Sequence, residues 1–404
     1  MKSKNELTDS RLEKLSIGWQ EDKITAFQKD FLRWYDRERR LLPWRENQDP
    51  YRIWVSEIML QQTQVVTVIP YFYRFMEWFP TIKDLAEAPE ERLLKAWEGL
   101  GYYSRVRNMQ VAAQQIMENF AGEMPKTITE ISTLKGIGPY TAGAIASIAF
   151  DLPEPAIDGN VMRVFSRLFE LDDDIVKPAS RKVFDYVVRK VISHQDPSSF
   201  NQAIMDLGSG TCTPTSPKCD SCPLQSYCGA YQKGTMTNYP VKSKKVKSRP
   251  VYYLAQVIRN QEGAYLVGQR ADTGLLANLW TFPLVEIASE EYADLRNQWQ
   301  EYQASQEPQL RLDLVAEEAF DLSDWIVTNR QDQAVVWQKQ PVGEVTHVFS
   351  HLKWHVLVTY GISKNSDYPL EAQQRWLKPT EFAEYAFPKP QQKIVELLQG
   401  LHYF

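Results

Sequence analysis

The four cysteines of this 404-residue chain form its most compact chemical motif. They fall within seventeen residues, at Cys212, Cys219, Cys222 and Cys228. Four thiolates at such short spacing can close around one site, which suits Zn²⁺ or an iron–sulfur cluster. Structural zinc sites usually carry two close cysteine pairs separated by a longer gap, and here only Cys219 and Cys222 form such a pair. The spacing therefore favours a cubane [4Fe-4S] cluster with a structural role.

Two carboxyl side chains occupy positions where they could act as acid and base. Glu57 lies inside the apolar run over residues 53–60. Burial there would raise the pKa of its carboxyl group and keep a proton available near neutral pH. The same pattern fits a carboxylate on the polar side of an amphipathic helix. Asp158 begins the sequence Asp-Gly-Asn, which equally fits a turn and a helix cap.

A glycine-rich turn offers a site for an anion. Gly136 and Gly138 lie between two helical patterns, where no side chain blocks access to the backbone amides. Amides at the N-terminus of a helix that begins at Pro139 would bind a phosphate, although an ordinary interhelical turn has the same composition. Arginine and aromatic side chains, the mixture that holds a nucleic-acid backbone and wedges into a base stack, favour the phosphate. They are Arg33, Arg37, Arg39, Arg40, Arg45, Tyr102, Tyr103, Arg105 and Arg107.

Helices must position these groups. Between about residues 24 and 230 the apolar residues recur mostly at spacings of three and four, and glycine and proline are confined to short breaks. Each segment carries an apolar stripe wide enough to pack on its neighbours. The predicted helices span residues 24–39, 51–60, 64–78, 103–120, 139–150, 160–170, 179–194 and 199–208.

The pattern changes after a basic linker. Residues 242–249 carry five positive charges and no negative one, which is typical of an exposed connector. The following runs VYYLAQVI, GAYLVGQR, LWTFPLVE and WHVLVTYGI are short, aromatic and β-branched. With helical stretches only near 289–303 and 390–399, they predict an α+β domain. The expected organisation is a tail over 1–24, an all-α domain over 25–230 with the cysteine loop 212–228, a linker over 231–250 and an α+β domain over 251–404.

The composition of the chain limits the classes of protein to which it can belong. The 43% hydrophobic and 24% charged residues are typical of a globular protein, and the length favours more than one domain. The net charge of -5 argues against nucleic acid, but residues 1–250 hold 34 basic and 31 acidic side chains (+3) and residues 251–404 hold 12 and 20 (-8). No apolar run suits a signal peptide or a membrane span, so we expect a cytoplasmic protein with reduced thiols.

Longer motifs resemble a known family. The segments LKGIGPYTAGAIASIAF and PAIDGNVMRVFSRLF, together with the cysteine loop, resemble the helix-hairpin-helix DNA glycosylases of the endonuclease III superfamily. LPWR, VSEIMLQQTQV, GLGYYSRVRN and FSH resemble the MutY type, whose members remove adenine mispaired with 8-oxoguanine. The resemblance covers about residues 25–404. It implies an all-α glycosylase domain with an iron–sulfur loop and a C-terminal α+β Nudix-like (MutT-like) domain.

The resemblance also implies roles for residues. Protonated Glu57 would donate to N7 of a flipped adenine, and ionised Asp158 would stabilise the oxocarbenium-like sugar. Tyr140 and Asn160 would orient Asp158 and the sugar. Trp44, Arg45, Leu60 and Gln202 would line the adenine pocket. The residues expected at the DNA and at 8-oxoguanine are Gln62, Thr63, Leu100, Tyr102, Gly136, Gly138, Phe349, Ser350 and His351.

Tyr140 bears on the reaction class. Bifunctional relatives carry a lysine at the corresponding position, whose amine attacks the sugar as a Schiff-base nucleophile. A tyrosine cannot do this, and Lys135 is the only amine nearby. We therefore expect a monofunctional enzyme that leaves an abasic site. A bifunctional endonuclease III-type glycosylase/lyase acting on oxidised pyrimidines is the alternative.

The C-terminal half is expected to recognise the damaged base. It lacks the R-E-U-x-E-E core with which Nudix hydrolases hold Mg²⁺, and the glutamates that first follow Phe282 are Glu286, Glu290 and Glu291, which do not form that core. No pyrophosphohydrolase activity is expected. Three of the five histidines, His347, His351 and His355, lie within residues 347–355, which leaves a metal site as an alternative to a DNA-reading hairpin with Ser350 at its tip.

Other classes of protein fit less of the sequence. A DNA-scanning module would not need Glu57 and Asp158 together, and a zinc-binding interaction protein would lack the visible colour of an iron–sulfur protein. The expected partner is double-stranded DNA with 8-oxoguanine:A or G:A mispairs, bound by a monomer that works in the cytoplasm on bacterial chromosomal DNA.

Overall fold

The described residues form two compact units. The computed structural model describes residues 17–243, 248–305, 322, 326, 334–364 and 368–404. The first unit comprises Met1–Pro89 and Ser104–Lys244, and the second comprises Glu90–Tyr103 and Lys245–Phe404. The expected tail (1–24) and basic linker (231–250) lie partly outside the described residues. Within the described part of the chain, no helix combines the length and apolar character needed to span a bilayer.

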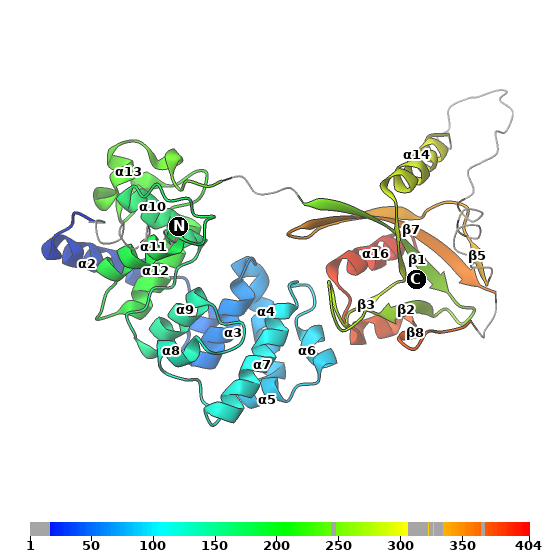
Figure 1. Cartoon of the computed structure of the whole chain (residues 1–404), viewed down its shortest axis with the longest axis horizontal. Helices are drawn as coiled ribbons and strands as arrows, with labels where there is room; N and C mark the ends of the chain where they lie inside the picture. Colours follow the sequence, from blue (N-terminus) through cyan, green and yellow to red (C-terminus); the bar gives the residue numbers. More distant parts are fainter. Residues whose placement is uncertain (1–16, 244–247, 306–321, 323–325, 327–333, 365–367) are drawn as a thin grey trace, which may run out of the picture. The chain divides into compact units, whose positions relative to one another are not determined.

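The first unit is helical (Figure 1). Its helices are α2 (Glu21–Glu38), α3 (Pro50–Leu60), α4 (Val65–Trp78), α5 (Ile82–Ala86), α7 (Ser104–Asn119), α8 (Ile128–Ile131), α9 (Pro139–Phe150), α10 (Gly159–Phe169), α11 (Ser180–Val191), α12 (Pro197–Gly210) and α13 (Gly229–Gln232). Short 3₁₀ turns occupy Pro43–Arg45 (η1), Cys219–Ser221 (η2), Gln225–Tyr227 (η3) and Met236–Asn238 (η4). The all-α prediction for this half is confirmed.

Caps and apolar stripes explain where these helices begin and pack. The Asp49, Asp158 and Asp196 side chains each accept a bond from a backbone N–H of the first turn of α3, α10 and α12, groups that would otherwise lack a partner. One buried core joins α2, α10, α11 and α12 through side chains such as Phe31 and Phe165. All eight predicted helices are present, while α5 and α8, with five and four residues, are too short to show a stripe in the sequence.

The second unit is built on a mixed sheet. Its strands are β1 (Arg249–Arg259), β2 (Tyr265–Gln269), β3 (Trp280–Thr281), β4 (Leu284–Ile287), β5 (Val335–Trp337), β6 (Gly343–Val348), β7 (Leu352–Ser363) and β8 (Gln374–Leu377). Its helices are α6 (Glu90–Ala96), α14 (Ser289–Ser305) and α16 (Lys389–Gly400), with a 3₁₀ turn at Pro379–Glu384 (η5). The main strand order is β3-β2-β1-β7-β5, with β4 on β1, β6 on β7 and β8 on β2. The α+β prediction is confirmed.

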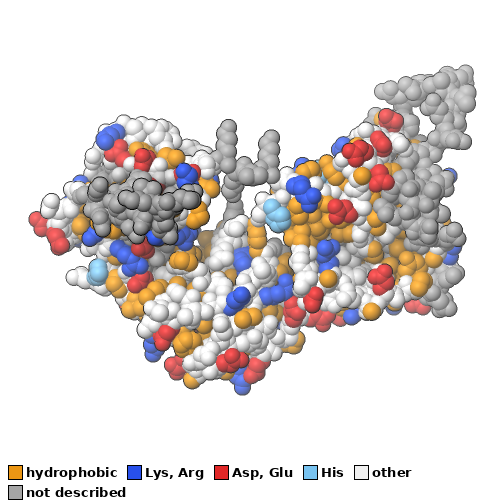
Figure 2. Space-filling model, in the orientation of Figure 1, with side chains coloured by type: hydrophobic (Ala, Val, Ile, Leu, Met, Phe, Trp, Pro, Cys, Tyr) orange, Lys and Arg blue, Asp and Glu red, His pale blue; other side chains and the backbone are white. Residues whose placement is uncertain are grey.

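A different helix covers each face of this sheet. Val257 on one face of β1 shares a core with Ile394 of α16, whereas Ile258 on the other face shares a core with Leu295 of α14. This alternation follows from the two-residue period of a strand. β1 and β7 pair in parallel, and all other pairs are antiparallel. Acidic side chains gather over α14, which begins with Glu290 and Glu291 (Figure 2).

Candidate active site

One cavity in the helical unit brings together most of the residues expected at the reaction centre. We call it the Glu57 cavity. Its volume of about 360 Å³ falls within the range of small-molecule sites. Nine expected residues line it: Trp44, Arg45, Glu57, Leu60, Thr63, Tyr140, Asp158, Asn160 and Gln202. They come from η1, α3, α9, α10, α12 and the loop after α3, so the fold assembles the cavity from segments far apart in sequence.

Glu57 is a buried acid near the end of α3. Its side chain is only 4% exposed, and its neighbours Ile53 and Ser56 also line the cavity. Burial raises the pKa of its carboxyl group to about 7, a shift that the charge of Asp158 reinforces and that the Tyr140 hydrogen bond and the charge of Arg45 oppose. Glu57 therefore exists in both protonation states near neutral pH. This is the property required of a general acid.

The side chain of Tyr140 is hydrogen-bonded to Glu57. Its hydroxyl donates to Oε2 of Glu57 over 2.6 Å. Burial raises the pKa of this phenol well above its ordinary range, so the hydroxyl keeps its proton. The resemblance implied that Tyr140 orients Asp158, and the structure differs because the hydroxyl bonds to the other carboxyl group. Tyr140 belongs to the first turn of α9, which follows the glycine turn.

Asp158 caps α10 and faces the same cavity. Its Oδ1 accepts from the Val161 N–H over 2.7 Å, and its Oδ2 accepts from Nδ2 of Asn160 over 2.9 Å. Burial raises the pKa of this carboxyl group, although these hydrogen bonds work in the opposite direction. Asn160 is held in turn by Nη2 of Arg163, which donates to its Oδ1 over 2.8 Å. The expected contact between Asn160 and Asp158 is therefore present.

Arg163 extends this chain of hydrogen bonds toward the cysteines. It is 8% exposed, and its guanidinium also donates to the carbonyls of Gly208 (2.6 Å) and Cys212 (2.8 Å). α10 and α12 lie very close together here, because a Cβ on Gly208 would be only 2.7 Å from Cβ of Asn160. A side chain at position 208 would therefore displace the residue that holds Asp158.

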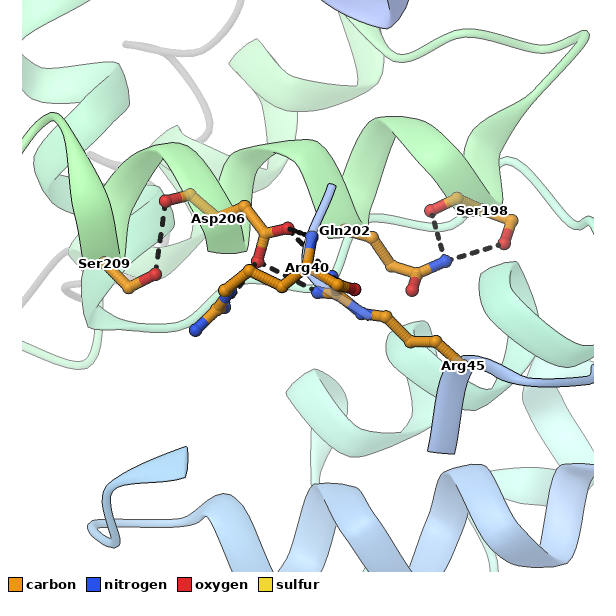
Figure 3. A network of polar contacts seen from close by, with 6 residues as sticks. All are labelled: Arg40, Arg45, Ser198, Gln202, Asp206 and Ser209. Atoms are coloured by element: carbon orange, nitrogen blue, oxygen red, sulfur yellow. Dashed lines mark hydrogen bonds and ion pairs between the residues drawn. The ribbon is translucent and has the colours of Figure 1, made fainter. Parts of the chain in front are cut away.

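η1 and α12 supply another part of the cavity wall. Trp44 is buried, with its ring centroid 5.5 Å from that of Phe72. Arg45 forms an ion pair with the buried Asp206 of α12, which also binds Arg40 (Figure 3). Gln202 turns its amide nitrogen toward Ser198, with Nε2 3.2 Å from the hydroxyl oxygen. Arg45 and Gln202 are thus held in fixed positions before any ligand enters.

Two loops of the helical unit present the residues expected to contact DNA. Gln62 is exposed and has a φ of 60°, an unusual conformation for a side chain other than glycine, asparagine or aspartate. Gly136 has a φ of 78°, and a Cβ there would lie 2.6 Å from Cβ of Asn108, so this position requires glycine. A Cβ on Gly138 would meet no atom within 4 Å, so the amides at the start of α9 are open to an anion.

The second unit holds the remaining expected residues. β6 and β7 form an antiparallel hairpin, as predicted, with exposed Ser350 and His351 at its tip and partly buried Phe349 before them. The hydroxyl oxygen of Tyr102 lies 2.8 Å from that of Ser350, so two motifs almost 250 residues apart meet. Leu100, also expected at the DNA, is only 7% exposed and packs in the core.

The cysteine loop fits an iron–sulfur cluster. All four cysteines are free of disulfides, and they line an apolar cavity of about 30 Å³ together with Arg167. In the described residues no group of three or more His, Cys, Asp or Glu side chains is arranged to hold a single metal ion. A cavity surrounded by thiols suits a multi-atom cluster better than one Zn²⁺. Nη1 of the buried Arg167 lies 3.2 Å from Sγ of Cys212, where it would stabilise a thiolate ligand.

Sequence reasoning missed several residues that support the site. Arg163 and Arg167 lie in the segment PAIDGNVMRVFSRLF but were given no role, and Asp206 lies in none of the quoted motifs. Each has a partner 45 or more positions away. Arg105, expected at the DNA, instead donates to the carbonyls of Ile58 and Gln61 at the end of α3, each over 2.7 Å. The one available signal was the periodicity of α10 and α12, which places Arg163, Arg167 and Asp206 among apolar positions.

Comparisons with known proteins agree with this arrangement. Residues 55–190 match the HhH-GPD superfamily of base excision DNA repair proteins, residues 212–228 the iron-sulfur binding domain of endonuclease III, and residues 254–397 the NUDIX domain. Adenine DNA glycosylase of Mus musculus is 34% identical over 93% of this chain and 78% of its own length. The Homo sapiens protein of that name is 33% identical over 93% of this chain and 74% of its own length.

One solved structure is similar over about half of this chain. A thermostable thymine-DNA glycosylase is similar over 52% of this chain and 98% of its own, with 25% identity and a TM-score of 0.47. The two mammalian relatives extend over most of both chains. The protein therefore belongs to the adenine DNA glycosylase family, and it is a DNA glycosylase of base excision repair that carries an iron–sulfur cluster.

Proposed function

We propose that this enzyme removes adenine from 8-oxoguanine:A and G:A mispairs by hydrolysing the N-glycosidic bond. The observation that carries the proposal is the pair of carboxyl groups in one cavity, of which Glu57 has a pKa of about 7 and receives a hydrogen bond from Tyr140. The names of the mammalian relatives support adenine as the base removed. Adenine would first have to leave the duplex, because its reacting atoms cannot reach Glu57 and Asp158 while the base is stacked and paired.

Glu57 supplies the proton. Protonated Glu57 donates to N7 of adenine, and the C1′–N9 bond breaks with its electron pair passing to the base, which leaves neutral. The Tyr140 hydroxyl stabilises the carboxylate that remains, because it donates to Oε2 and keeps its own proton. The carboxylate then accepts a proton from the attacking water, which returns Glu57 to its initial state.

Asp158 stabilises the sugar. The positive charge that develops on the sugar when adenine leaves is opposed by the Asp158 carboxylate, which can also bond to C1′ until water replaces it. Asn160 and the Val161 N–H fix both oxygens of this carboxylate. We infer that Asn160 orients Asp158, and that Tyr140 acts on Glu57.

We further propose that the enzyme is monofunctional. None of the residues lining the Glu57 cavity, all of which lie in the described part of the chain, is a lysine. Lys135 is an exposed residue of the glycine turn. Without an amine at the sugar, the product is an abasic site and not a Schiff base. The bifunctional alternative therefore lacks an amine for its first step among the described residues that line this cavity.

The second unit provides the residues for recognising 8-oxoguanine. Ser350 and Tyr102 form a pair of adjacent hydroxyl groups, each able to donate or accept a hydrogen bond. We propose that Ser350 bonds near N7-H or O8 of the damaged base, the two positions where it differs from guanine. The open amides at Gly138 would bind a backbone phosphate, and the enzyme would act as a monomer on chromosomal DNA in the cytoplasm.

A glycosylase assay tests this function. Wild type and Glu57→Gln are incubated with duplexes that contain 8-oxoguanine:A, G:A, 8-oxoguanine:C or T:A, and free adenine and strand breaks are measured separately. We expect adenine release from the first two duplexes by wild type only. Borohydride is added in parallel, and an efficient covalent adduct would refute the monofunctional mechanism. Equal release by both proteins would refute the role of Glu57.

A further inference from the structure

A buried carboxylate on α12 binds two arginines at once. Asp206 is 7% exposed. Its Oδ1 accepts from Nη2 of Arg45 over 3.1 Å, and its Oδ2 accepts from Nη1 of Arg45 over 2.8 Å, which is the two-point geometry of a strong ion pair. Oδ1 also accepts from Nε of Arg40 over 2.7 Å and from Nη2 of Arg40. Figure 3 shows both arginines converging on Asp206 below α12.

This cluster lies in the wall of the Glu57 cavity. Arg40, Arg45 and Gln202 line that cavity and also a second cavity of about 590 Å³, lined on its other side by residues such as Tyr35. Asp206 itself lines neither. It therefore acts from behind the wall, by holding the arginines that separate the two spaces.

We propose that Asp206 is a positioning residue for adenine excision, which fixes the guanidinium of Arg45 in the cavity wall and compensates its charge beside Glu57. The proposal rests on the proposed function, since it assigns Asp206 a part in that reaction. Asp206 does not touch the cavity, so its contribution passes through Arg45.

The geometry explains the positioning. Nη1 of Arg45 donates to Asp206 and to the carbonyl of Arg40, and Nη2 donates to Asp206. Among the described residues, Nε and one hydrogen of Nη2 have no partner, so they remain available to the acceptor atoms of a base. Without Asp206 the guanidinium could rotate, and a displacement of about 1 Å near a reaction centre can cost about 100-fold in rate.

The charges of the cluster explain how Asp206 affects the protonation of Glu57. The ionisable groups that face Glu57 are Tyr140 from α9, Asp158 from α10 and Arg45 from η1. Burial alone would raise the pKa of Asp206, but the hydrogen bonds and charges of Arg45 and Arg40 lower it, so Asp206 is ionised at neutral pH. If its charge were removed, two uncompensated cations would favour the ionised form of Glu57 and so deplete the acid.

The test compares variants of the full-length enzyme in single-turnover adenine release between pH 5.5 and 9. For Asp206→Asn we expect a rate constant about 10- to 100-fold lower at pH 7, with the decline on the alkaline side beginning at lower pH than in wild type. Asp185→Asn is the matched control, because Asp185 also pairs with an arginine, Arg189, over 2.8 Å, but both of these side chains of α11 are more than 40% exposed. Its rates should stay within about twofold of wild type at every pH.

Two more variants separate charge from position. Asp206→Glu keeps the charge and moves the carboxylate by one methylene group, so we expect a lower rate with the alkaline decline in its wild-type position. The double variant Asp206→Asn with Arg40→Gln restores the net charge of the cluster, so its alkaline decline should return toward that of wild type while the rate stays low.

The outcomes distinguish the two proposals. If wild type releases no adenine from any duplex, the proposed function is wrong. If wild type is active and Asp206→Asn matches it in rate and in pH dependence, the role of Asp206 is wrong. If Asp206→Asn fails to fold, as shown by thermal melting, Asp206→Glu decides, and a wild-type rate in that variant would overturn the positioning role.

Discussion

The pKa of Glu57 predicts how adenine release depends on pH. With a pKa of about 7, about half of the enzyme carries the catalytic proton at pH 7. With the ordinary value of 4.5, only about 1 molecule in 300 would carry it. Burial in α3 thus increases the population of the active acid about 150-fold, which corresponds to about 3 kcal/mol. Raising the pH above 7 removes that advantage.

The expected decline can be worked out from this pKa. Between pH 7 and 8 the protonated fraction of Glu57 falls about fivefold, and above pH 8 it falls about tenfold for each pH unit. On the acid side the rate falls when Asp158 is protonated. Because burial raises the pKa of Asp158, this fall begins at a higher pH than for an ordinary aspartate. The rate profile should therefore be bell-shaped, with its alkaline limb set by Glu57.

The assay is single-turnover adenine release with enzyme in excess over an 8-oxoguanine:A duplex. DNA affinity is measured at the same pH values, so that loss of binding is not mistaken for loss of chemistry. Glu57→Gln should lose about 100- to 10,000-fold in rate and show no alkaline limb. Glu123→Gln, which changes an exposed glutamate of the same unit, should behave as wild type. A wild-type rate that stays level or rises between pH 7 and 9 would refute the assignment of Glu57 as the acid.

Three further predictions concern stability and recognition. In urea unfolding Glu57→Gln should be about 3 kcal/mol more stable than wild type at pH 8, because the stability that protonated Glu57 provides is complete below pH 4.5 and lost as the pH rises through about 7; equal stability at pH 8 would contradict this. Arg163→Gln should lose about 2–4 kcal/mol of unfolding free energy, since it breaks three buried hydrogen bonds, and at least about tenfold in rate through Asp158; a wild-type rate would show that this link does not matter. Ser350→Ala should reduce the preference for 8-oxoguanine:A over G:A more than it reduces turnover, measured as the ratio of the two single-turnover rates, and an unchanged ratio would exclude Ser350 as the reader.

The sequence predicted the elements that have a long, regular pattern. The spacing of apolar residues located α2, α9 and α12 to within a few residues, because each buries a continuous stripe. Strands such as β5 and β8, with three and four residues, are defined by pairing with distant strands and have no local pattern. The hairpin of β6 and β7 was predicted, and the quoted run WHVLVTYGI lies within β7.

The site was predictable only where a residue belongs to a recognisable motif. Glu57 and Tyr140 stand in segments whose pattern is long, and the cavity includes both. The hydrogen bond between them could not be foreseen, because the direction of the Tyr140 hydroxyl depends on how α9 packs on α3, 83 residues away in sequence. The role of Asp206 could not be predicted, because no motif marks this residue. It is one acidic residue in a helix, and only the fold shows that Arg40 and Arg45 reach it.

The two helices that shape the cavity also hold the cysteine loop, which gives the iron–sulfur cluster a structural connection to the chemistry. α10 begins after Asp158 and carries Arg163 and Arg167 along the face that meets the loop. α12 ends two residues before Cys212. Loss of the cluster would release Cys212, remove an acceptor from Arg163 and loosen the support of Asn160 on Asp158. We therefore expect loss of the cluster to lower the rate without any redox step, through the support that Arg163 and Asn160 give to Asp158.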